Sequence, residues 1–199
     1  MILRITAGKL SIAGNYELTG TIPTELFLLT NMTELFLSFT LLTGTLPKKI
    51  SQLSKLEVLD LNQAAISGTI PEELYAAGMD HLWFLDLAGN QFSGTISTNV
   101  GRLRSMTYLY FRENPNLVGT IPSEIGLLTA LQRIHVHRSN FTGSIPDELC
   151  ELKYKYLDVL NADCLVDSAT GEIPTVCAES CCTKCCDRET GICEKLTGA

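Results

Sequence analysis

Eight cysteines are the most reactive side chains of this 199-residue sequence, and all of them lie in its last quarter. They are Cys150, Cys164, Cys177, Cys181, Cys182, Cys185, Cys186 and Cys193. Thiolates either bind a metal or pair as disulfides, and the spacing Cys182-x-x-Cys185 suits zinc. Adjacent Cys-Cys pairs overfill a tetrahedral site, however, and no histidine lies nearby to complete one. The even number therefore favours a disulfide-rich C-terminal cap, with zinc as the alternative, and the sequence selects no pairing.

Two other groups of residues could do chemistry. His135 and His137 alternate along the chain and could share a metal, but their strand has no carboxylate or cysteine. The favoured interpretation is two solvated histidines or a pH-sensitive edge of the surface. Asp60 and Asp86 occupy equivalent positions of a repeated pattern. An open surface lacks the enclosed cleft that a catalytic carboxylate pair needs, so we interpret them as a solvated acidic spot. No metalloprotease or phosphate-loop motif appears. We therefore expect a protein that is not an enzyme and needs no cofactor or metal.

The elements that position these residues follow a period. A Gly followed by Thr or Ser and then Ile or Leu recurs every 24 to 26 residues. These glycines are Gly20, Gly44, Gly68, Gly94, Gly119 and Gly143. Such a period is typical of stacked coils. Each coil has one short alternating stretch, such as Leu59-Asp60-Leu61, which predicts a strand with one buried face. The sequence thus predicts an α/β solenoid of about seven coils with a parallel sheet on its concave side.

The convex side is predicted from the prolines that follow the glycines, at Pro23, Pro47, Pro71, Pro122 and Pro146. In the fourth coil Ser97 takes the place of the proline. Proline favours an extended residue before it and the first turn of a helix after it. We expect short 3-10 or α turns there.

The pattern Leu82-x-x-Leu85-x-Leu87-x-x-Asn90-x-Phe92-x-Gly94 resembles the plant-specific class of leucine-rich repeat, over roughly residues 10–164. The resemblance implies that an Asn after each strand bonds to backbone groups of neighbouring coils. Its position is filled unevenly, by Asn15, Asn90 and Asn114, by Thr40 and Ser139, and by Ala64 and Ala162.

The end of the chain, including Cys181-Cys-Thr-Lys-Cys-Cys186, is similar to the C-terminal tail of secreted or cell-surface leucine-rich repeat proteins of algae in the diatom lineage. We predict two units, a solenoid over residues 1–164 and a Cys-rich cap over residues 165–199. A cap is expected because the last coil would otherwise expose its apolar interior.

An extracellular or cell-surface location is expected from the disulfides and from two glycosylation acceptors, Asn31-Met-Thr33 and Asn140-Phe-Thr142. The residues after Met1 contain no apolar signal-peptide core, and we interpret the sequence as a mature or incomplete chain.

The outward positions of the fourth to sixth strands carry large aromatic and cationic side chains. The candidate ligand-binding residues are Phe84, Asp86, Tyr108, Tyr110, Arg112, Arg133, His135, His137 and Arg138. Tyr and Arg dominate binding energy at many interfaces, although aromatic pairs also stabilise sheets without any ligand. The seventh strand is expected to present Tyr156, Asp158 and Leu160 outward.

A formal net charge of −7 and a pI near 5.0 argue against nucleic acid or anionic lipid as partners, and no apolar run is long enough to insert in a membrane. The family resemblance implies receptor-like ectodomains and inhibitors of wall-degrading enzymes. We therefore predict an extracellular recognition module for a protein, peptide or polysaccharide. The alternatives are ice binding by stacked Thr-Gly-Thr rows and a structural matrix or adhesive role. The oligomeric state is left open.

Overall fold

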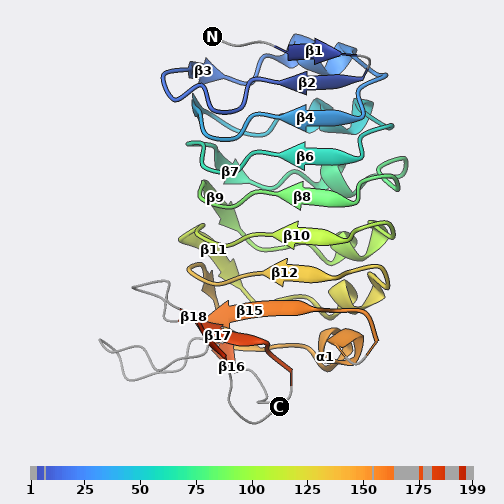
Figure 1. Ribbon diagram of the computed structural model, residues 1–199, viewed down its shortest axis with the longest axis vertical. Helices are drawn as coiled ribbons and strands as arrows, with labels where there is room; N and C mark the ends of the chain where they lie inside the picture. The colour runs from blue at the N-terminus through green and yellow to red at the C-terminus, as the bar shows by residue number, and fades with distance from the viewer. Residues whose placement is uncertain are drawn as a thin grey trace.

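The computed structural model is a regular stack of coils, described over residues 4–6, 8–153, 155–163, 175–176, 181–186 and 193–195. The short strands of one face lie one above another along the long axis of the molecule (Figure 1). Along the chain, most of these strands are followed by a helical turn that lies on the other side of the stack. The predicted α/β solenoid is confirmed.

One face is a ten-stranded sheet, which we call the main sheet. In spatial order its strands are β1 (Arg4–Thr6), β2 (Lys9–Ser11), β4 (Glu34–Phe36), β6 (Val58–Asp60), β8 (Phe84–Asp86), β10 (Tyr108–Tyr110), β12 (Arg133–His135), β15 (Val159–Asp163), β17 (Lys184–Cys186) and β18 (Cys193–Lys195). All pairings from β2 to β17 are parallel, whereas β1 and β18 pair antiparallel at the two ends. The parallel ladder is therefore one strand longer than the seven predicted, because the Cys-rich tail contributes β17.

The predicted register of the seventh strand is wrong. Arg133 pairs with Val159 and Ile134 with Leu160, so Leu160 points into the core and is fully buried. Tyr156 and Asp158 lie in the turn before β15. The reason is the preceding helix, α1, which has seven residues where the other coils have four or five. The last coil therefore uses more residues before its strand begins.

The tail is held by disulfides, as predicted. Cys150 at the end of the solenoid is bonded to Cys181, and the buried Cys182, Cys185 and Cys186 are disulfide-bonded as well. Cys164 and Cys177 lie outside the described residues, and Cys193 begins β18. The predicted division of the chain at residue 164 also falls outside them and stays a prediction.

Short helical turns cover the opposite side. They are η1 (Thr24–Leu28), η2 (Lys48–Gln52), η3 (Glu72–Tyr75), η4 (Thr98–Arg102), η5 (Ser123–Leu127) and α1 (Asp147–Lys153). Prolines directly precede η1, η2, η3 and η5 with extended backbone, as the sequence predicts. Where Ser97 replaces proline, its hydroxyl accepts a hydrogen bond from Asn99 N–H and caps η4 instead. Among the described residues, no helix combines the length and apolar character that crossing a bilayer requires.

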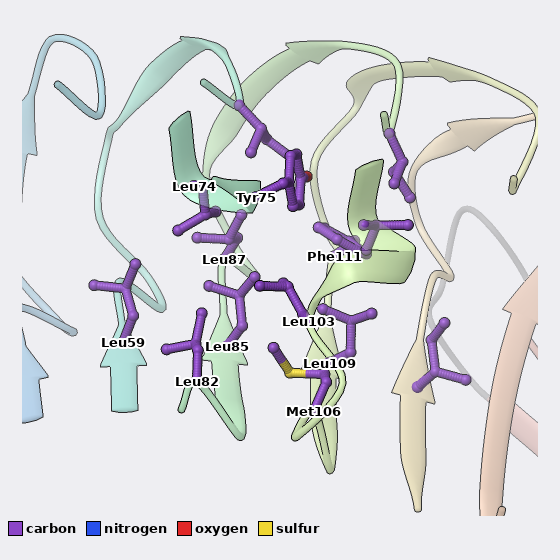
Figure 2. Close-up of a cluster of buried hydrophobic side chains, with 14 of the residues drawn as sticks. Leu59, Leu74, Tyr75, Leu82, Leu85, Leu87, Leu103, Met106, Leu109 and Phe111 are labelled. Carbon is purple, nitrogen blue, oxygen red and sulfur yellow. The ribbon is translucent and has the colours of Figure 1, made fainter. Parts of the chain in front are cut away.

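The strands and turns enclose a continuous core in which equivalent leucines stack from coil to coil. Figure 2 shows Leu59, Leu85 and Leu109 from three successive strands beside Leu82 and Met106 from the turns before two of them. Asn90 closes the turn after β8. Its amide donates to the carbonyls of Leu61, Leu87 and Ala88, and its oxygen accepts from Ile66 N–H. The Asn position therefore joins neighbouring coils, as the family resemblance implies.

A second set of strands runs beside the main sheet and contains the repeated glycines, except Gly44, which directly follows its strand. These strands are β3 (Thr19–Thr21), β5 (Leu41–Thr43), β7 (Ser67–Thr69), β9 (Gln91–Gly94), β11 (Asn116–Gly119), β13 (Asn140–Phe141), β14 (Gly143–Ser144) and β16 (Thr175–Val176). Gly68 has a φ of +76°, and a Cβ there would lie 2.8 Å from the Thr45 methyl of the preceding coil. Both the backbone conformation and the close stacking of coils therefore require glycine.

Candidate binding surface

Three neighbouring strands, β8, β10 and β12, bring the predicted binding residues into rows. Phe84, Tyr108 and Arg133 share one register position, and Asp86, Tyr110 and His135 share the next. Arg112 and His137 follow their strands by two residues and extend the same outward face, whereas Arg138 lies in the turn after β12 with a φ of +56°. We call the surface formed by these nine residues the aromatic–cationic face.

The rings of this face touch one another across neighbouring strands and, for His135 and His137, along one coil. Ring centroids are 5.9 Å apart for Phe84 and Tyr110, 4.8 Å for Tyr110 and His135, and 5.7 Å for His135 and His137. The Arg133 guanidinium lies over the Tyr108 ring, 5.7 Å from its centroid. These contacts fix the side chains before any ligand arrives, so the surface is preorganised.

Trp83 extends the ring cluster and was missed from the sequence. Its ring meets Phe84 at 5.9 Å and Tyr108 at 6.0 Å, in edge-on contacts. It precedes β8 and so falls outside the alternating positions of the strand. The signal that could have revealed it is chemical: it is the one tryptophan of the chain, directly beside a predicted aromatic site.

An open depression of about 380 Å³ lies at the C-terminal part of the face. Its lining consists of Asp86, Tyr110, Arg112, His135, His137, Asn161 and Lys184. Asn161 and Lys184 come from β15 and β17 and were not predicted. No periodic pattern could have placed them, because β15 is shifted in register and β17 belongs to the tail.

The two histidines are less solvated than predicted. His137 is only 7% exposed and its Nδ1 has no hydrogen-bond partner among the described residues, while His135 is half-buried. Burial is the main reason that the pKa of both imidazoles is lowered to about 4. At His135 the nearby His137 and Arg112 lower the pKa further, and at His137 the positive charge of Arg112 has the same effect. Both rings are therefore neutral at physiological pH. The interpretation as two solvated histidines is wrong for His137.

Asp86 is not part of a solvated acidic spot, because its side chain is buried with only 7% exposure. Burial raises its pKa to about 6, the negative charge of Asp60 adds to the increase, and hydrogen bonds from Ala88 N–H and Asn62 Nδ2 oppose it. Asp60 is more exposed and accepts from the Ser38 hydroxyl at 2.7 Å and from Asn62 N–H at 3.0 Å. Outward orientation on this sheet thus does not guarantee exposure, since large neighbours cover the smaller side chains.

Arg112 is held in place by a chain of polar contacts along the turn. Its Nη1 lies 2.6 Å from Glu113 Oε1, and Glu113 Oε2 accepts from Gln63 Nε2 at 3.2 Å. Gln63 reaches Glu113, two coils further along the stack, because Gly89 of the coil between them has no side chain. A Cβ on Gly89 would collide with Gln63 Nε2. The orientation of Arg112 therefore depends on residues from three coils.

The other predicted site residues lie on the surface of the solenoid. Asn31 is exposed and accepts from Lys55 Nζ, and Asn140 is exposed and donates to Pro115 O. Both acceptor asparagines are thus accessible, which glycosylation requires. Within the described part of the chain, no three His, Cys, Asp or Glu side chains gather into a metal site.

Comparison with known proteins identifies the repeat. The Leucine Rich Repeat family model matches residues 81–103, and no curated protein matches the chain. A plant peptide hormone receptor, RGFR1, solved in complex with RGF2, is 37% identical with a TM-score of 0.66, covering 74% of this chain and 23% of the receptor.

Two further solved structures are similar. The leucine-rich repeat ectodomain of the Arabidopsis thaliana membrane receptor kinase GASSHO1/SCHENGEN3, in complex with CASPARIAN STRIP INTEGRITY FACTOR 2, is 26% identical with a TM-score of 0.74, covering 94% of this chain and 22% of that one. A plant ice-binding protein is 27% identical with a TM-score of 0.69, covering 77% and 47%. The chain thus spans less than a quarter of the length of the two receptors.

Proposed function

Because this chain is a leucine-rich repeat protein of the plant type, we propose that it is an extracellular recognition module that binds a peptide or protein ligand on its aromatic–cationic face. The observation that carries the proposal is the row of large, partly exposed aromatic and cationic side chains along β8, β10 and β12. Similar plant receptors were solved with ligands of this kind, RGF2 in one case.

The chemistry of the face supports a peptide ligand. Phe84, Tyr108 and Tyr110 offer flat apolar surface, while Arg112 and Arg133 offer planar guanidinium groups that pair with carboxylates or backbone carbonyls. Because ring contacts already fix these side chains, ligand binding loses little side-chain entropy. The same stacking surface suits sugar rings, so an acidic polysaccharide is the competing ligand class.

The location and the absence of catalysis belong to the same proposal. A disulfide such as Cys150–Cys181 persists in an oxidising compartment, which supports an extracellular or cell-surface protein. Exposed Asn31 and Asn140 support glycosylation there. We propose no enzymatic activity, since the sequence has no catalytic motif and the candidate surface is an open sheet rather than a cleft.

The test is a screen of the purified protein against a displayed peptide library and a glycan array, followed by affinity measurements on each ligand found. Tyr110→Ala and Arg112→Ala should each weaken binding about tenfold or more. Tyr16→Ala is the matched control, because Tyr16 is an exposed aromatic residue in the first coil, away from the face. Ligands that bind both face variants and the wild type equally would show that the assignment is wrong, and glycan hits alone would replace the peptide with a polysaccharide.

Ice binding is a second candidate function, which one feature favours. The threonines that follow the repeated glycines are exposed in successive coils, and their methyl groups rest on the glycine of the next coil. The hydroxyls before the glycines are less available, since Thr43 and Ser67 donate to the carbonyls of Gly20 and Gly44. Thermal hysteresis of the purified protein tests this function, and its absence would exclude it.

A further inference from the structure

The disulfide-bonded tail reaches the aromatic–cationic face. β17 pairs in parallel with β15, so Lys184 stands opposite Asn161, which in turn stands opposite His135. Lys184 thus continues the row that begins with Asp86 and Tyr110, and it lines the same depression. A segment expected only to close the solenoid therefore places a cation in the candidate binding surface.

We propose that the tail completes an anion-binding subsite, in which Lys184 joins Arg112 and His135 to hold a carboxylate, sulfate or phosphate group of the ligand. This inference rests on the proposed function and assigns the chemistry of one end of the ligand.

The charges around the depression favour an anion. Arg112 and Lys184 line the depression, and together with Arg133 they act on the His135 ring through their positive charge. Of the nearby carboxylates, Glu113 is already paired with Arg112, and Asp86 accepts two hydrogen bonds. Within the part of the chain that the structure describes, no salt bridge involves Arg133 or Lys184. Lys184 therefore remains available to a ligand, whereas Arg133 already bonds the Tyr110 side chain and lies over the Tyr108 ring.

The imidazoles add polar groups that a bound ligand could satisfy. His137 is buried, lines the depression and has a ring nitrogen, Nδ1, without a partner among the described residues. A buried polar atom of this kind is costly unless a ligand or water satisfies it. The neutral His135 imidazole can donate one N–H to an anion without adding a second buried charge, while the single N–H of neutral His137 already bonds the Asn161 backbone and leaves Nδ1 as an acceptor for water or a ligand hydroxyl.

The tail is fixed well enough to position Lys184. Cys181, three residues earlier, is bonded to Cys150, and the following Cys185 and Cys186 are buried and disulfide-bonded. Thr183 also bonds Leu160, donating its backbone N–H and hydroxyl to the Leu160 carbonyl and accepting the Leu160 N–H. Lys184 therefore sits on a strand secured on both sides, not on a free terminus.

Inorganic sulfate is the probe for this subsite, because it stays fully charged across the useful pH range. Sulfate is titrated into the full chain at constant ionic strength against chloride, and binding is followed by the imidazole resonances of His135 and His137, with His81 outside the depression as reference. We expect a saturable shift of both resonances with sulfate and none with chloride. Parallel titrations with phosphate and acetate show which anion the site prefers.

Lys184→Gln should weaken sulfate binding about tenfold, the value of one charge-assisted hydrogen bond. Lys184→Arg should largely retain binding, and Lys155→Gln, which removes the same charge from an exposed turn, should leave it unchanged. Absence of saturable shifts, or equal binding by Lys184→Gln and wild type with the spectrum otherwise unchanged, would overturn the proposal. If the sulfate site is found but no peptide or glycan binds, the proposed function is wrong and the subsite is retained. If peptide binding depends on Tyr110 but not on Lys184, the proposed function is retained and the subsite is wrong.

Discussion

Replacement of Asp86 by asparagine should stabilise the protein at neutral pH, and the size of the effect follows from burial. The ordinary pKa of an aspartate, 3.8, is raised to about 6 at Asp86, chiefly because burial disfavours the charged form. At about 1.36 kcal/mol per pH unit, this difference corresponds to about 3 kcal/mol of destabilisation once the carboxyl is ionised. Local relaxation and water reduce this value, so we expect Asp86→Asn to gain about 1 to 3 kcal/mol at pH 7.5.

The pH dependence gives the prediction its sign. The folded protein binds the Asp86 proton more tightly than the unfolded chain, so the stabilising contribution of this group is complete below pH 3.8 and is lost as the pH rises through about 6. At pH 4 both wild type and variant carry an uncharged side chain, and their stabilities should nearly coincide. The histidines, with their lowered pKa values, act in the opposite direction, but they are present in both proteins and cancel in the difference.

The local hydrogen bonds allow the substitution. The amide oxygen introduced by Asp86→Asn would still accept from Ala88 N–H, which Asp86 Oδ1 accepts at 2.9 Å. The introduced amide nitrogen would face Asn62 Nδ2, but Asn62 Oδ1 is buried and unpartnered among the described residues, so rotation of the Asn62 amide restores a donor–acceptor pair. The variant therefore removes a charge and leaves the number of unsatisfied groups unchanged, because the Asn62 amide nitrogen takes the place of the unpartnered oxygen.

Urea unfolding of wild type and variant at pH 4 and pH 7.5 measures the effect, with the disulfides kept oxidised. Asp80→Asn is the control, since it removes the same charge from an exposed turn just before β8 and should change stability by less than about 0.5 kcal/mol at either pH. A difference between Asp86→Asn and wild type that is equal at both pH values would refute the reasoning, because burial of the charge could then not be its cause.

Three further substitutions test the forces that join the coils, each by urea unfolding. Asn90→Ala removes the hydrogen bonds between adjacent coils and should cost about 2 to 4 kcal/mol; a cost below about 1 kcal/mol would mean that water replaces the amide. Gly68→Ala adds both left-handed backbone strain and a clash with the Thr45 methyl, whereas Gly20→Ala adds only strain. Gly68→Ala should therefore cost about 1 kcal/mol more stability than Gly20→Ala, and equal costs would contradict the stacking argument. Joint replacement of Cys150 and Cys181 by serine should cost about 4 kcal/mol for a separation of 31 residues, and unchanged stability would show that the other disulfides hold the tail alone.

The repeated part of the fold was predictable because its residues are constrained from coil to coil. Gly68 needs a left-handed backbone and space for Thr45, and Asn90 must serve two coils at once. These requirements recur with each coil and therefore appear in the sequence as a period. The prolines before the helical turns are predictable for the same reason.

The parts that escaped prediction lie where the period ends. The coil before β15 replaces a 3-10 turn by the helix α1, and Leu157 and Leu160 are both candidates for the buried centre of the strand when only the sequence is considered. β17 has no repeat pattern, since disulfides rather than stacked leucines hold it. The burial of Asp86 and His137 was missed for another reason: strand alternation predicts the direction of a side chain, not the size of its neighbours.

The residues that depart from the repeat also determine which groups the candidate surface presents to a ligand. A regular coil presents its outward residues to water, and a ladder of identical coils would make a uniform face with no preferred site. Here Gly89 opens a path for Gln63 to reach Glu113, which holds Arg112, while the tail adds Lys184 at a position where a solenoid would otherwise end. The regular residues thus stabilise the scaffold and the irregular ones shape what it can bind, so substitutions at irregular positions should alter recognition more than stability.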